Sequence, residues 1–138
     1  MKLGFALLEV GSVRAKNTSN ILLKNVLDTV AGALIYYAIG YGLQFEQRGG
    51  VIGQGNFAAY GFSKPKDYLK LIFYFGFCGT STTIVSGAVA ERMYSDTYLV
   101  YAVIMTGFIS PIAAGWAWGG GWLQVLGFQD FCGSGVVH

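Results

Sequence analysis

The chain contains a single histidine, His138, and the segment that it closes also holds Asp130. No Asp, Glu, Lys or Arg occurs from Thr97 to Gln129, so both residues lie inside or beside an apolar run long enough to cross a bilayer. An ionisable side chain at membrane depth is energetically costly, which makes each of them a candidate functional residue. On a helix, their separation would correspond to a rise of roughly 12 Å. A neutral imidazole both donates and accepts hydrogen bonds, so His138 has the chemistry to take up or pass on a proton near neutral pH.

Three aromatic residues could attract a cation or block its passage. The indole face of Trp118 can bind a cation with about 0.5 to 2 kcal/mol as water is removed. Phe73 and Phe77 are four residues apart, so a helix would place both rings on one face. Taken alone, Trp118 fits an anchor at the membrane interface better, and the two phenylalanines fit an apolar stripe against lipid or a neighbouring helix. His138 alone would likewise be a buried, hydrogen-bonded histidine, and Asp130 a helix N-cap.

Patterns typical of enzymes and cofactor sites do not occur in the sequence. Asp130, Ser134 and His138 recur every four residues, but one helix cannot fold a histidine back between a serine and an aspartate, so they make no hydrolase triad. Cys78 and Cys132 form no CxxC pair and have no neighbouring histidine, so we expect no metal site. The formal net charge is only +2 and the basic residues are scattered, which argues against nucleic acid as a partner. We therefore expect neither an enzyme nor a cofactor.

The composition is that of a membrane protein. Hydrophobic residues make up 54% of the chain and charged residues 12%, against roughly 25% charged residues in soluble domains. A helix needs about 20 apolar residues to cross the hydrocarbon core. Three segments are long enough, namely Ile21–Leu43, Leu71–Ala90 and Thr97–Gln129. In the first of them, Lys24 and Asp28 lie one helical turn apart and could pair with each other.

We therefore predict an all-α fold, a polytopic transmembrane helical bundle in a lipid bilayer. Helices are expected at Leu3–Val13, Ile21–Leu43, Tyr68–Arg92 and Thr97–Trp118, with a restart near Asp130. Pro111 lacks an amide hydrogen and should kink or locally open its helix. Small residues four apart, such as Gly115 and Gly119, favour close packing of helices in lipid.

Three blocks of the sequence agree in order and spacing with one known family. They are GFALLEVGSVRAKN near the start, IVSGAVAERM in the middle, and WGGGW followed by DFCGSGVVH at the end. On these blocks the chain resembles the ammonium transporter family, in the Amt branch of the Amt/Rh superfamily. The likeness implies an eleven-helix transporter built from an inverted five-plus-five repeat and assembled as a homotrimer in the plasma membrane. Residues 1–138 would be a single transmembrane domain fragment from the N-terminal half, with a partial first helix, three full spans and the start of a fifth helix.

The same likeness implies transport of ammonium or ammonia through a hydrophobic pore. Trp118 would recruit the cation in the outer vestibule, and Phe73 and Phe77 would occlude the pore, with Phe77 at the gate. His138 would line the pore and assist deprotonation together with a second histidine beyond these residues. Asp130 would hold the pore helix and shape the field that attracts the cation. The alternatives are a membrane ammonium sensor that keeps the site, and an Rh-like ammonia gas channel, against which the WGGGW and GFALLE blocks argue.

Overall fold

The computed structural model describes residues 2–48 and 50–138, and in that part of the chain the regular structure is entirely helical. Its α-helices are α1 (Lys2–Ser12), α2 (Thr18–Ile35), α3 (Tyr41–Gln44), α4 (Pro65–Val89), α5 (Ser95–Ile104), α6 (Ser110–Trp118) and α7 (Trp122–Val125). Two π-helical turns join neighbouring helices into longer rods. Tyr36–Gly40 connects α2 to α3, and Met105–Ile109 connects α5 to α6.

Three helical stretches, the two joined rods and the single helix α4, are long and apolar enough to cross a membrane. They are Ala15–Gln44, Pro65–Val89 and Ser95–Val125, and each is called a rod below. Each exceeds the roughly 20 residues that a helix needs to cross the hydrocarbon core. The prediction of an all-α, polytopic membrane fold is confirmed.

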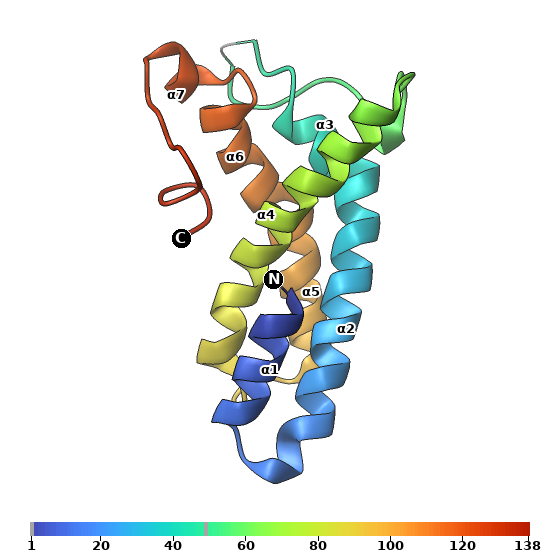
Figure 1. The fold of residues 1–138 in the computed structure, drawn as a ribbon, viewed down its shortest axis with the longest axis vertical. Helices are drawn as coiled ribbons and strands as arrows, with labels where there is room; N and C mark the ends of the chain where they lie inside the picture. The colour runs from blue at the N-terminus through green and yellow to red at the C-terminus, as the bar shows by residue number, and fades with distance from the viewer. Residues whose placement is uncertain (1, 49) are drawn as a thin grey trace.

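The rod that contains α2 runs alongside α5, whereas α4 crosses obliquely over α5 and α6 (Figure 1). Helix α1 lies against α2 and α4, and α2 packs along α5. Beyond α7 the chain turns back and runs down beside α6 and α4 to its C-terminus (Figure 1). The C-terminal segment therefore comes close to the middle of α4, where the sequence places its phenylalanines.

The start of α4 follows from its local sequence. Pro65 occupies the first turn, where the missing amide hydrogen costs nothing. The Asp67 carboxylate accepts hydrogen bonds from the backbone N–H of Lys64 at 3.1 Å and of Ser63 at 3.3 Å. These bonds satisfy amides that a helix start leaves open, so the helix begins earlier than the predicted Tyr68.

The turn before Pro111 opens as expected for a proline inside a helix. Pro111 lies in the first turn of α6, directly after the π-helical turn Met105–Ile109. A proline cannot donate to the carbonyl one turn back, and its ring crowds that carbonyl. The wider turn accommodates the ring without ending the rod.

The predicted pairing of Lys24 with Asp28 is wrong, because each finds its partner on α1. Lys24 Nζ lies 2.6 Å from Glu9 Oε1, and Lys2 Nζ lies 2.5 Å from Asp28 Oδ2. Helix α1 lies alongside α2, so its charged side chains reach Lys24 and Asp28 directly. The i, i+4 pair within α2 therefore does not form. Spacing along one helix could not reveal these partners on another.

The Glu9 carboxylate is the most heavily bonded group of this buried cluster. Besides Lys24, it accepts hydrogen bonds from Asn25 Nδ2 at 2.9 Å and from Ser86 Oγ on α4 at 2.8 and 2.9 Å. Glu9 is only 7% exposed and Ser86 is fully buried. The ammonium of Lys24 also lies 4.6 Å from the centre of the Tyr98 ring on α5. One carboxylate thus ties together α1, α2 and α4.

Outside the spans, Glu91 links the turn after α4 to the turn between α1 and α2. Arg14 Nε donates to both carboxylate oxygens, at 3.2 and 3.1 Å, and Asn17 Nδ2 donates at 2.6 Å. These bonds, those of Arg14 first, lower the pKa of Glu91 from 4.5 to about 2. The carboxylate stays charged well into acid.

We predict that Glu9→Ala destabilises the whole protein in detergent by about 3–5 kcal/mol, because it leaves the Lys24 ammonium buried without its carboxylate. Chemical denaturation followed by circular dichroism measures the change. Glu46→Ala is the matched control, because Glu46 is exposed and accepts a hydrogen bond from Asn56; its cost should stay within about 0.5 kcal/mol. Equal effects of the two substitutions would contradict the role given to Glu9.

The Glu91 contact makes a separate prediction about pH. Its contribution to stability should be complete above pH 4.5, the ordinary pKa, and should be lost as the pH falls through about 2, where the folded carboxyl takes up a proton. Glu91→Gln should therefore lower the melting temperature at pH 7 but not at pH 2. A melting-temperature difference that does not change over this range would show that the Glu91 charge contributes nothing.

Candidate substrate cavity

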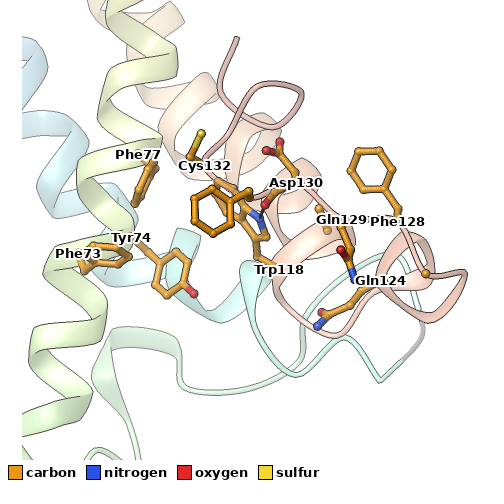
Figure 2. A pocket seen from close by; sticks show the side chains of 12 residues that line it. Phe73, Tyr74, Phe77, Trp118, Gln124, Phe128, Gln129, Asp130 and Cys132 are labelled. Atoms are coloured by element: carbon orange, nitrogen blue, oxygen red, sulfur yellow. Dashed lines mark hydrogen bonds between the residues drawn. The ribbon is translucent and has the colours of Figure 1, made fainter.

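A cavity of about 500 Å³ opens between α4 and the chain that follows α6. Figure 2 shows aromatic rings from α4 on one side and the indole of Trp118, at the end of α6, facing them. Phe73, Tyr74, Phe77, Trp118 and Asp130 all line this space. Four of the five predicted site residues, from two helices and one loop, therefore meet around one cavity.

The aromatic rings contact one another edge to face. Phe73 and Phe77 have ring centres 5.1 Å apart and an interplanar angle of 72°. The Phe77 and Trp118 centres are 5.5 Å apart at 66°. Phe73 is 61% exposed, whereas Phe77 is half-buried and contacts the indole. Phe77, rather than Phe73, closes the inner side of the cavity.

The indole of Trp118 is fixed at both ends. Its Nε1–H donates to the backbone carbonyl of Asp130 at 2.8 Å. Its backbone continues into three glycines, which pack against the end of α3. The backbone N–H of Gln47 donates to the backbone carbonyl of Gly119 at 3.2 Å. A hydrogen bond therefore fixes the orientation of the indole ring, and backbone contacts of the following glycines fix the position of the Trp118 backbone.

The glycines allow an approach that no other residue would permit. A Cβ on Gly119 would overlap the carbonyl oxygen of Gln44, and one on Gly115 would overlap the side-chain amide of Gln47. Gly120 adopts a φ of +83°, in the left-handed region that favours glycine. The close packing expected of Gly115 and Gly119 is therefore present at the end of α3.

Asp130 uses its carboxylate to organise the loop that carries it. Oδ1 accepts the amides of Gly133 and Ser134 at 2.7 and 3.0 Å, and Oδ2 those of Gly135 and Val136 at 2.9 and 2.8 Å. Burial raises the pKa of this carboxyl, but the four amides together lower it below its usual value. The carboxylate therefore has a structural role, in which it holds a turn together by accepting backbone amides.

The helix expected to restart near Asp130 does not form in this structure. Residues 131–137 make bends and turns around the Asp130 carboxylate instead. Gly133 has a φ of +98°, which interrupts helical geometry directly after Asp130. Asp130 and His138 are consequently not stacked along one helix axis.

His138 does not join the other four predicted residues in the lining of the cavity. Its side chain is exposed and it does not line the cavity. Its backbone N–H donates to the Gly133 carbonyl at 3.3 Å, which fixes the end of the turn rather than the imidazole. The pore role of His138 stays a prediction.

Tyr74 lines the cavity, and the sequence interpretation did not include it. Its ring centre lies 6.3 Å from that of Trp118 and 6.5 Å from that of Phe77. Phe73, Tyr74 and Phe77 occupy positions i, i+1 and i+4, so a wide helical face toward Trp118 includes all three. The position of Tyr74 directly after Phe73, on the same helical face, was the available signal in the sequence.

Comparison with known proteins gives one consistent result. The model of a family described as Ammonium Transporter Family matches residues 1–138. A relative from Synechocystis sp. is 45% identical, with all of this chain aligned to 33% of its length. Ammonium transporter Amt1 of Haloferax mediterranei is 43% identical, and ammonium transporter 1 member 3 of Solanum lycopersicum is 42% identical, over 29% and 32% of their lengths and all of this chain. The chain spans about a third of the length of these relatives.

The glycine contacts predict a specific sensitivity at Gly119. Gly119→Ala should destabilise the protein by about 1–3 kcal/mol, because the added methyl group must displace the Gln44 carbonyl. Gly76→Ala is the matched control, since a Cβ there meets no heavy atom of the described residues within 4 Å. Denaturant unfolding in detergent compares the two variants. A Gly119→Ala protein as stable as the control would contradict the close approach.

Proposed function

This chain belongs to the ammonium transporter family, and on that premise we propose that the whole protein carries ammonium or ammonia across a membrane. The observation that supports this proposal best is the cavity in which Trp118 faces the rings of α4. It offers π faces to a small cation at the end of a membrane-spanning rod.

Capture of the ion at Trp118 is the first step of the proposed mechanism. Removing water from a small cation in a low-dielectric passage costs several kcal/mol, so the protein must replace that water. An indole face attracts a cation, with about 0.5 to 2 kcal/mol as desolvation proceeds. The hydrogen bond from Trp118 Nε1 to Asp130 keeps this face in place without using a charged group.

Passage beyond Phe77 is the second step. The ring blocks the inner side of the cavity, so a substrate has to displace it by a rotamer change. Phe73, exposed at the mouth, contacts Phe77 and guides its movement.

Loss of the proton and movement of neutral ammonia complete the path. Ammonia carries no charge and crosses an apolar passage at much lower cost than ammonium. We assign the proton transfer to His138, whose imidazole can both donate and accept a hydrogen bond. Asp130 acts by holding the loop and Trp118, not by binding the ion, because its oxygens already accept four amides.

We further propose that the protein works as a homotrimer in the plasma membrane. As a separate part of this proposal, the turns that hold Arg14 and Glu91 face the cytoplasm and the loop between α3 and α4 faces outward. On this orientation the Trp118 cavity opens to the outside, as uptake requires, because α6 ends on the same side as that loop (Figure 1).

Expression of the whole protein in cells that lack their own ammonium uptake tests the proposal. Wild type should restore growth on low ammonium and uptake of labelled methylammonium. Trp118→Leu should raise the KM about 2- to 30-fold, which corresponds to the loss of the cation–π energy. Trp122→Leu is the matched control, because Trp122 contacts Trp116 and does not line the cavity.

Two results would count against this function. Correct membrane insertion without uptake would favour a sensor that binds ammonium but does not transport it. Equal KM values for wild type and Trp118→Leu would show that the cation is captured elsewhere.

A further inference from the structure

A second, much smaller cavity lies behind the rings of the outer one. Its volume is about 10 Å³, close to the space that one water-sized molecule needs. Gln44, Ser81 and Ser110 are among its polar lining residues. Tyr74, Phe77 and Trp118 line both this inner cavity and the outer one. These three rings therefore form the partition between the two cavities.

Tyr74 is an equal member of this partition. Its ring projects from α4 toward the indole of Trp118 (Figure 2). The two planes are tilted by 51°, with their centres 6.3 Å apart. Tyr74 is half-buried, and its ring packs edge to face on Phe45 with centres 4.8 Å apart. Contacts on several sides hold the ring where a cation at Trp118 would meet it.

The aromatic group around Tyr74 already accepts one ammonium group from the chain itself. Lys70 Nζ lies 4.1 Å from the centre of the Phe45 ring and 6.0 Å from that of Tyr74. These distances lie within the range for cation–π attraction. Neither Lys70 nor Phe45 lines the outer cavity. The aromatic cluster around Tyr74 thus holds one cation of the chain itself, on the Phe45 side of the ring and away from the outer cavity.

We propose that Tyr74 contacts the ammonium ion in the outer cavity and sets its affinity together with Trp118. This inference rests on the proposed function, and it adds a residue to the binding site. The cation lies between the phenol and indole rings, and both faces replace part of its water. The phenol ring, rather than its hydroxyl, makes the contact.

Direct binding measurements on the purified whole protein test this inference. Ammonium chloride is titrated while intrinsic tryptophan fluorescence is recorded, with sodium chloride at the same ionic strength as reference. Tyr74→Leu should weaken binding about 2- to 5-fold, the loss expected for one cation–π contact at a partly exposed site. Tyr74→Phe keeps the ring and should bind as wild type does. In the uptake assay, Tyr74→Leu should raise the KM by a similar factor and leave the maximal rate nearly unchanged.

Tyr68→Leu is the matched control on the same helix. Tyr68 is 52% exposed, packs on Phe62 and does not line the outer cavity, so its loss should leave binding unchanged. Unchanged binding by Tyr74→Leu would overturn the inference, as would a lower maximal rate with an unaltered KM, which a merely structural role predicts. Ammonium binding by wild type without uptake would refute transport alone, whereas uptake with normal binding by Tyr74→Leu would refute the role of Tyr74 alone.

Discussion

Charges removed from water must be paired, and this constraint fixes the arrangement of the helices. The Glu9 carboxylate accepts from Lys24 and Asn25 on α2 and from Ser86 on α4. Each of these partners would leave a buried polar group unsatisfied if a helix shifted by one residue. The rotation of α4 about its axis is thereby set at Ser86. Because a helix is rigid over two or three turns, the direction in which Phe77 and Tyr74 project is set as well.

A second constraint, close backbone packing, acts on the other wall of the cavity. Gly115 and Gly119 let α6 approach the end of α3 more closely than any side chain would allow. Trp118, directly before Gly119, is carried to a fixed position opposite α4. The buried hydrogen bonds of Glu9 thus position the rings of α4. The close packing allowed by the glycines positions the indole of Trp118. The cavity lies where these two independent constraints bring the rings of α4 opposite the indole of Trp118.

Much of this architecture could be predicted from local sequence, and the parts that could not depend on neighbours in space. Apolar runs predicted the three rods, and a spacing of four residues predicted that Phe73 and Phe77 share a face. The partner of Lys24 could not be predicted, because Glu9 and Asp28 are equally suitable until the packing of α1 is known. The turns after Asp130 replace an expected helix because four amides converge on one carboxylate. The sequence did not single out Tyr74, because a tyrosine beside phenylalanines also fits an apolar helix face.

The largely aromatic and apolar lining of the cavity bears on the proposed transport. Among the described residues that line it, Asp130 carries the charge, and its oxygens accept the loop amides. An ion that met a bare carboxylate in an apolar site would bind too tightly to leave quickly, because the attraction grows as the dielectric constant falls. Conduction requires binding that is favourable enough for entry and weak enough for release. In the mechanism that we propose, aromatic faces supply attraction of that intermediate strength, while the Asp130 carboxylate is engaged by four backbone amides.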